Sequence, residues 1–270
     1  MVLTVSAASA SSPREDAAMS ALGSSFTQGT VAVEGTTLHY VKGGSGAPLV
    51  LLHGWPQTWV EWAPVMPALA QGHTVIAFDL PGLGTSTVPT GGFDKATTAK
   101  RIREGVQKLG FTGQISILAH DVGSLVAYPY ARDFPTEVSR LAVLETPLSG
   151  FGLENFYGIS WHLGFNQTAA PVPETIMDND DVPTYLGWLF SGAHHPDRIP
   201  QQTYFDAYSY PPGGPRATTT TARSPATPPT TRPRPPATIC RCRCWPWVPS
   251  SPSALSWPSR SARSPTTCGV

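Results

Sequence analysis

The segment QISILAHDVGSLVAYPYARDF, residues 114–134, decides the fold. It opens with a continuous apolar run and continues, after Asp121, with apolar residues at helical spacing, which predicts a buried strand leading directly into a helix. The junction is a turn of small residues, with Ala119 and Gly123 on the two sides of Asp121. Such a turn presents one side chain at the carboxyl end of a strand, and the backbone N–H groups that follow point at the same place.

The flanking sequence repeats this alternation of strand and helix. Further apolar runs are PLVLLHG (48–54), HTVIAFD (73–79) and SRLAVLE (139–145), and the segments with helical period are 61–72, 93–110 and 122–134. Residues 30–43 alternate apolar and polar side chains around Gly35 and predict an antiparallel hairpin. The pattern predicts an α/β fold with a mostly parallel sheet. Its strand ends are expected to surround one crevice, at His53, Asp79, His120, Asp121 and Glu145.

Composition divides the chain into four parts. Residues 1–25 are small and polar, without the basic start and apolar run of a secretory signal, and we expect a disordered leader. Residues 26–147 are expected to form the α/β core, and the aromatic-rich residues 148–210 a partial helical lid. Residues 211–270, rich in Pro, Arg, Thr and Ser, are expected to be a disordered tail.

Charge and cysteines separate this tail from the rest of the chain. All 18 acidic residues precede residue 213, whereas the residues from 213 onward contain 8 Arg and no acidic residue. The abrupt change is typical of a GC-rich gene read out of frame, so we interpret the tail as a frameshift, with a genuine basic tail as the alternative. All four cysteines lie there, and their Cys-X-Cys-X-Cys spacing is typical of neither a zinc site nor a disulfide framework.

Asp121 is the candidate nucleophile. A carboxylate presented by a strand-to-helix turn attacks an electrophilic carbon and forms an ester, which favours such a substrate over an acyl group. The alternative is that Asp121 caps the helix that follows it. The HGWP motif at residues 53–56 favours the catalytic interpretation, because the backbone N–H groups of Trp55 and Val122 would together form an oxyanion hole.

Three segments carry a resemblance to a known family: LLHGWPQTWVEW (51–62), AFDLPGLGTS (77–86) and AHDVGSLVAYPYA (119–131). They resemble the α/β-hydrolases with an Asp nucleophile, which include epoxide hydrolases and haloalkane and haloacetate dehalogenases. The resemblance covers residues 48–210 and implies an α/β-hydrolase fold with a helical lid. It implies that Asp121 is the nucleophile and that Trp55 and Val122 are the oxyanion donors. The remaining motif positions are His53, Gly54, Pro56, His120 and Gly123.

The resemblance also gives roles to Glu145 and His162. Glu145 ends an apolar run where one branch of the family has the acid that orients the catalytic His, and a solvated strand-end carboxylate is the alternative. The Trp161-His162 pair resembles the Trp-His of a bacterial epoxide hydrolase branch, in which a lid His and a lid Tyr hold the epoxide oxygen. It also resembles that of haloacetate dehalogenases, where the pair helps to bind halide. A donor there fits epoxide opening, because an alkoxide forms as the C–O bond breaks. A structural lid histidine is the alternative.

One expected catalytic group has no match in the sequence. The family places its general base, a His, on a loop after the last strand, whereas the histidines of this chain end at His195 in the expected lid. We therefore expect a truncated or shifted hydrolase on which an ester of Asp121 accumulates. An uncovered edge of the parallel sheet would also predict poor solubility.

The sequence favours epoxide opening through an Asp-alkyl ester. The alternatives are a haloalkane or haloacetate dehalogenase and a non-catalytic binding protein or pseudogene product with this fold. We expect a small-molecule epoxide or halide as substrate, and no cofactor or metal, because the sequence has no Gly-rich phosphate loop and no cluster of metal ligands. Arg residues dispersed among prolines argue against nucleic acid. No apolar run has the length of a membrane span, so we expect a cytoplasmic protein.

Overall fold

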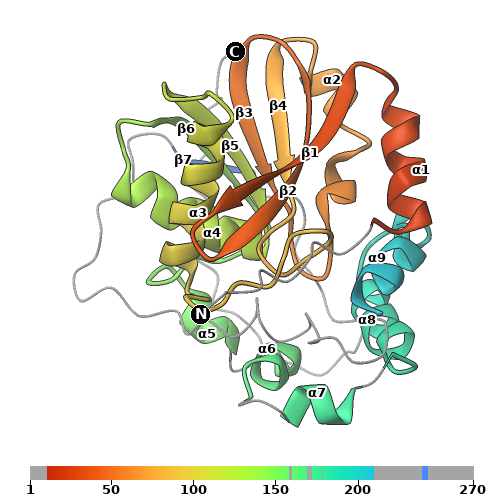
Figure 1. The fold of residues 1–270 in the computed structure, drawn as a ribbon. Helices are drawn as coiled ribbons and strands as arrows, with labels where there is room; N and C mark the ends of the chain where they lie inside the picture. The colour runs from red at the N-terminus through yellow and green to blue at the C-terminus, as the bar shows by residue number, and fades with distance from the viewer. Residues whose placement is uncertain (1–10, 158–159, 169–171, 178, 210–238, 243–270) are drawn as a thin grey trace, which may run out of the picture.

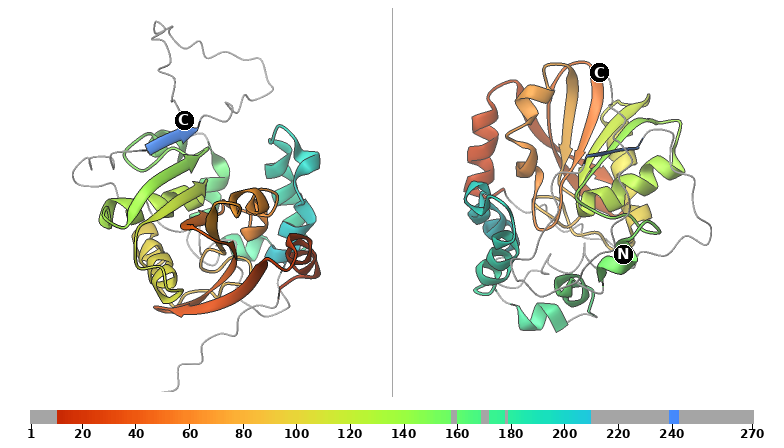
Figure 2. Two further views of the ribbon diagram at one scale, coloured as in Figure 1. Left: turned by 90° about the horizontal axis from the view of Figure 1, so that it is seen from above. Right: turned by 180° about the vertical axis from the view of Figure 1, so that it is seen from behind.

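The computed structural model describes residues 11–157, 160–168, 172–177, 179–209 and 239–242. In this part of the chain the strands form one sheet, in the order β1-β2-β4-β3-β5-β6-β7. Helices α5 to α9 gather at one end of this sheet (Figure 1). Helix α3 and the pair η1 and α2 lie on opposite faces of the sheet (Figure 2, left).

The strands are β1 (Phe26–Val33), β2 (Thr36–Gly44), β3 (Ala47–Leu52), β4 (His73–Phe78), β5 (Ile115–His120), β6 (Val138–Leu144) and β7 (Ile239–Cys242). β1 and β2 form an antiparallel hairpin, and β2 is also antiparallel to β4. All the other strand pairs are parallel. The predicted hairpin and the predicted mostly parallel sheet are therefore confirmed.

The helices of the core are α1 (Pro13–Leu22), the 3-10 helix η1 (Trp59–Trp62), α2 (Met66–Leu69), α3 (Lys95–Lys108) and α4 (Val122–Asp133). Those of the lid are α5 (Leu153–Tyr157), α6 (Trp161–Asn166), α7 (Val172–Ile176), α8 (Val182–Ser191), the 3-10 helix η2 (Pro196–Arg198) and α9 (Gln201–Tyr208). Helices are thus observed where a helical tendency was predicted, in residues 148–210, and each of them is short. No helix of the described residues is long and apolar enough to cross a membrane.

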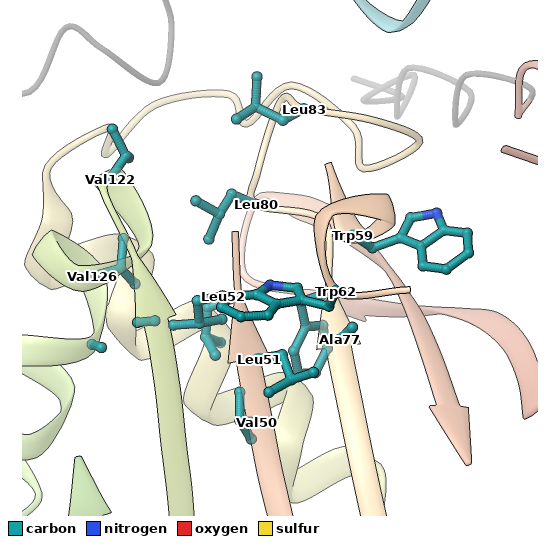
Figure 3. Packing of buried hydrophobic residues seen from close by; sticks show 14 of the residues in the cluster. Val50, Leu51, Leu52, Trp59, Trp62, Ala77, Leu80, Leu83, Val122 and Val126 are labelled. Atoms are coloured by element: carbon teal, nitrogen blue, oxygen red, sulfur yellow. The ribbon is translucent and has the colours of Figure 1, made fainter. Parts of the chain in front are cut away.

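The core lies between the sheet and its helices. The side chains of Val50, Leu51 and Leu52 on β3 are fully buried, as expected for a central strand covered on both faces. Burial of each such side chain stabilises the fold by about 1.5 to 3 kcal/mol. Figure 3 shows that Val122, at the start of α4, lies beyond Leu52, at the same end of the sheet as Leu80 and Leu83. The sheet therefore presents the start of α4 to the lid.

Three predictions about local structure need correction. The expected helix at residues 61–72 is instead η1 followed by the single turn of α2, because Pro64 and Pro67 remove backbone donors within it. The second half of the expected disordered leader forms α1. Within the expected structureless tail, residues 239–242 form β7, parallel to β6; residues 211–238 and 243–270 lie outside the described residues.

Helix α1 is held in place by a capping box and by burial. Ser12 Oγ accepts from the Glu15 N–H (3.3 Å), and a Glu15 carboxylate oxygen accepts from the Ser12 N–H (3.1 Å). Glu15 is buried, and Arg14 forms a surface ion pair with Asp206 of α9 (3.1 Å). Burial, reinforced by the charge of Asp79, raises the pKa of Glu15 from 4.5 to about 7.

The raised pKa of Glu15 makes stability depend on pH. A carboxyl whose pKa is higher in the folded state contributes stability that is complete below about pH 4.5 and is lost as the pH rises through about 7. Glu15→Gln keeps an acceptor for the cap and removes the buried charge. We expect the variant to exceed the wild type in unfolding free energy at pH 8 by roughly 1 to 3 kcal/mol, and to match it near pH 5.

Urea unfolding at the two pH values measures this difference. Asp16→Asn, on the exposed side of the same helix, is the control and is expected to give the same small change at both pH values. A gap between Glu15→Gln and the wild type that does not change with pH would contradict the assignment.

Candidate active site

The backbone at Asp121 makes a sharp turn between β5 and α4. Asp121 has φ 45° and ψ −120°, and with Glu145 (φ 58°) it is one of two non-glycine residues with positive φ among the described residues. Its own N–H donates to the Leu144 carbonyl (3.2 Å), and its carbonyl accepts from the Ser124 N–H (2.9 Å). Positive φ costs a non-glycine residue about 1 to 3 kcal/mol, so the surrounding hydrogen bonds help to hold Asp121 in this conformation.

Gly123 allows α4 to start directly against β3. A Cβ at this position would overlap the carbonyl oxygen of Leu52 and would lie 2.7 Å from that of His53. Both are backbone atoms, so no side chain can move aside to make room. The predicted requirement for a small residue two positions after Asp121 is thus explained by close approach of two backbone segments.

The carboxylate of Asp121 is held by the loop that follows β3. Its Oδ2 accepts from the Trp55 N–H (2.9 Å), and its Oδ1 lies 3.4 Å from the Thr146 hydroxyl. Asp121 is the N-cap residue of α4 by position, but its side chain makes no capping hydrogen bond to the helix. The N–H of Trp55, the predicted oxyanion donor, thus faces the Asp121 carboxylate. Val122 is the first residue of α4, where helix N–H groups have no partner inside the helix.

The other residues of the HGWP motif build this loop. His53 is fully buried; its Nδ1 contacts the Gly54 carbonyl (2.8 Å), and its Nε2 accepts from the Leu80 N–H (3.0 Å). This arrangement fastens the loop to the segment that follows β4. Pro56 is also buried, and the Gln57 N–H donates to the Gly54 carbonyl (2.9 Å). His53, Gly54 and Pro56 thus support Trp55 structurally.

Asp79 does not belong to the crevice, contrary to the expectation for its strand end. It is fully buried, accepts from the N–H groups of Trp59 (2.8 Å) and Thr85 (3.1 Å), and pairs with His39 (2.9 Å). Burial opposes ionisation, but the bond from His39, the charges of His39 and His53 and the Trp59 N–H together outweigh it and lower the pKa of Asp79. Its carboxylate therefore holds the surrounding loops together through these hydrogen bonds.

His120 and Glu145 lie at the ends of neighbouring strands. His120 Nε2 is 3.4 Å from Glu145 Oε2, and His120 Nδ1 is 2.8 Å from Glu61 Oε1. Burial acts to lower the pKa of His120, but the bonds to Glu145 and Glu61 outweigh it and raise the pKa to about 11. The bond from His120 also lowers the pKa of Glu145. Glu145 is more than half exposed, so it is both solvated and paired, and its imidazole partner is His120.

The lid docks on the loop through the indole of Trp55. The ring of His162, on α6, stacks on Trp55 with an interplanar angle of 7° and a centroid distance of 6.1 Å. The rings of Tyr185 (α8) and Tyr208 (α9) pack against the same indole, with centroid distances of 5.9 and 6.4 Å. Burial lowers the pKa of His162, opposed by the negative charge of Asp121. At neutral pH His162 is therefore a neutral ring beside the site, with one N–H to donate.

Lys95, the first residue of α3, is a further charge near Asp121. Burial lowers its pKa to about 8, opposed by the charges of Asp121 and Asp94. No sequence pattern points to Lys95, because its interaction with Asp121 depends on how α3 is placed on the sheet. Thr146 and Glu61 were also not predicted as site residues. Thr146 follows Glu145 in the sequence, and Glu61 lies in the segment 51–62 that carries the HGWP motif.

A family model described as alpha/beta hydrolase fold matches residues 47–234. The chain belongs to the α/β-hydrolase fold family. The match spans more than half of the chain and includes the turn at Asp121 and the loop at Trp55. The resemblance inferred from the three sequence segments is confirmed.

The curated relatives of this α/β-hydrolase-fold chain include an epoxide hydrolase and a dehalogenase. It is 51% identical over 113 residues to the soluble epoxide hydrolase of Corynebacterium sp. (strain C12), covering 42% of this chain and 39% of that protein. It is 37% identical over 174 residues to the fluoroacetate dehalogenase of Burkholderia sp., covering 61% of this chain and 57% of that protein. The chain thus spans less than two thirds of the length of either relative.

Solved structures give the same family. The Cfl2 protein from Burkholderia cenocepacia superposes with a TM-score of 0.67 at 32% identity, over 79% of this chain and 73% of that one. The epoxide hydrolase CorEH, without ligand, superposes with a TM-score of 0.62 at 34% identity, over 73% of both chains. Both superpositions agree with the α/β-hydrolase fold shown by the family model.

All seven histidines of this α/β hydrolase lie among the described residues. The negative charge of Asp121 acts to raise the pKa of both His120 and His162. His194 and His195 contact each other on the exposed surface between α8 and η2. Within the described ranges, no group of three or more His, Cys, Asp or Glu side chains could hold a metal ion.

Proposed function

We propose that this chain opens epoxides by attack of Asp121 on a carbon of the ring. The observation that carries the proposal is the position of the Asp121 carboxylate, on a turn with positive φ, hydrogen-bonded to the Trp55 N–H (2.9 Å), whose indole stacks with the lid histidine His162. A carboxylate fixed in this way is already oriented, so the cost of ordering it is not incurred during the reaction. Oδ2 is engaged by Trp55, which leaves Oδ1 to attack.

The proposed first step forms one bond and breaks one bond. Asp121 Oδ1 forms a bond to a ring carbon, and the bond between that carbon and the ring oxygen breaks, which gives a hydroxyalkyl ester once the alkoxide has taken a proton. The neutral ring of His162 donates a hydrogen bond to the oxygen as its charge develops, and water supplies the proton. Trp55 and Val122 N–H groups would stabilise the oxyanion formed when the ester is later hydrolysed.

Hydrolysis of the ester requires a base to activate water. Glu145, the predicted partner of that base, is paired with His120. The pKa of His120 is about 11, so at neutral pH His120 is protonated and cannot accept a proton. His162 is the donor in the first step. We therefore propose that the ester of Asp121 accumulates on this chain.

Consumption of a neutral aryl epoxide tests the proposed function. The full chain is expected to consume about one equivalent and then to stop, because the ester is not released. Asp121→Asn, which keeps the size of the side chain, is expected to consume none. Product diol and remaining epoxide are measured by chromatography over time. Sustained turnover would contradict the accumulation of the ester, and equal consumption by Asp121→Asn would contradict the role of Asp121.

The role of His162 is tested by a substitution that keeps a flat ring. His162→Phe preserves stacking on Trp55 and removes the N–H donor, so the first equivalent of epoxide is expected to be consumed roughly 100-fold more slowly. His194→Phe, in an exposed part of the lid, is the control and should leave the rate unchanged. Equal rates for wild type and His162→Phe would assign His162 to lid packing alone.

A dehalogenase is the second candidate, and Lys95 favours it. Its ammonium is close enough to interact with the charge of Asp121. A cation near the nucleophile could pair with the carboxylate of a bound haloacetate. The matched assay is halide release from a haloacetate under the same conditions. Halide release without epoxide consumption would support this second function over the first.

A further inference from the structure

One carboxylate, that of Glu61, joins the two backbone segments that form the site. Its Oε2 accepts from the Gly54 N–H (2.8 Å), and its Oε1 lies 2.8 Å from His120 Nδ1. Glu61 belongs to η1, and its side chain is 13% exposed. A partly buried carboxylate with a hydrogen bond on one oxygen and an ion pair on the other is restricted to a narrow range of positions.

The two partners of Glu61 each precede a residue of the site. Gly54 precedes Trp55, and His120 precedes Asp121. The segments are already in contact, because a Cβ on Gly54 would lie 2.6 Å from His120 Nδ1 and 2.9 Å from Asp121 Cβ. The carboxylate of Glu61 therefore spans the same two segments as the hydrogen bond from Trp55 to Asp121.

We propose that Glu61 is a positioning residue that keeps the Trp55 N–H at hydrogen-bonding distance from the Asp121 carboxylate. The predicted effect of Glu61 on the reaction rate rests on the proposed attack by Asp121. Its predicted effect on the hydrogen bond between Trp55 and Asp121 does not. Glu61 does not touch the reacting atoms. It acts through Gly54 on one side and through His120 on the other.

The two donors explain why a carboxylate occupies this position. Gly54 N–H and protonated His120 Nδ1 both require acceptors, and a carboxylate offers two. A glutamine offers one acceptor oxygen and one NH₂ group. It can satisfy both partners if His120 loses its proton and accepts at Nδ1, so Glu61→Gln is expected to preserve the link partly.

Glu61 is not needed to fold η1. Thr58 caps this turn through a bond from the Val60 N–H (3.4 Å), and the Trp59 N–H donates to Asp79 (2.8 Å). The indoles of Trp59 and Trp62 are buried in the core. Removal of the Glu61 carboxylate should therefore loosen the link between the segments and leave the turn in place.

The test compares Glu61→Ala and Glu61→Gln with Glu137→Ala. Glu137 is the control because its carboxylate is also partly buried and bonded, to Arg103 (2.6 Å), away from the site. Two quantities are measured on the full chain: the rate constant for the first equivalent of aryl epoxide at saturation, and hydrogen–deuterium exchange of the Trp55 amide, which does not depend on activity.

Glu61→Ala is expected to lower the saturated rate constant by about 10- to 100-fold, with little change in the half-saturating epoxide concentration, because the bound atoms are misaligned. Exchange at the Trp55 amide should be at least about tenfold faster. Glu61→Gln should recover part of both effects, and Glu137→Ala should change neither. Unchanged exchange in Glu61→Ala, or equal effects of Glu61→Ala and Glu137→Ala, would overturn the proposal. If the wild type consumes no epoxide, the proposed function fails, and the exchange data still decide the positioning role.

Discussion

The hydrogen bond from the Trp55 N–H to Asp121 Oδ2, 2.9 Å long, is the interaction on which the site depends. It connects the loop after β3 with the turn after β5, two neighbouring parallel strands. It forms because Asp121 has a positive φ that turns its side chain away from the capping position of α4 and towards the loop. Gly54 and Gly123 make the approach possible, because any side chain at either position would meet atoms of the facing segment. Strain in the turn is therefore balanced by contacts that only small residues permit.

The loop at Trp55 also determines where the lid lies. The indole of Trp55 contacts rings from α6, α8 and α9, so the residue whose N–H faces Asp121 is also the residue on which the lid packs. Charge is arranged around the same point. His120 is kept positive between Glu61 and Glu145, whereas burial keeps His162 neutral. The two imidazoles near Asp121 thus have different chemical capacities, one as a fixed cation and the other as a neutral hydrogen-bond donor.

Sequence reasoning predicted the features that depend on local pattern. The central strands were found because burial on both faces requires continuous apolar runs, and the turn at Asp121 was found because close packing requires small neighbours. Helix α1 was missed although its signal, Ser12 followed by Pro13 and then Glu15, is that of a capped helix start. The contact of Glu61 with His120 was not predictable, because it joins residues far apart in sequence through the placement of η1 on the sheet. The partner of Glu145 was hidden for the same reason: adjacency of β5 and β6 brings His120 to it, and no sequence pattern reports that pairing.

The most direct test of the account is the location of the covalent bond. The full chain is incubated with excess aryl epoxide, digested under mildly acidic conditions and analysed by tandem mass spectrometry. Attack by Asp121 predicts one added substrate mass, placed by fragmentation on Asp121 and absent from the peptides that contain Glu61 and Glu145. An adduct on either of those glutamates, on a histidine, or an unmodified Asp121 after epoxide has been consumed would contradict it.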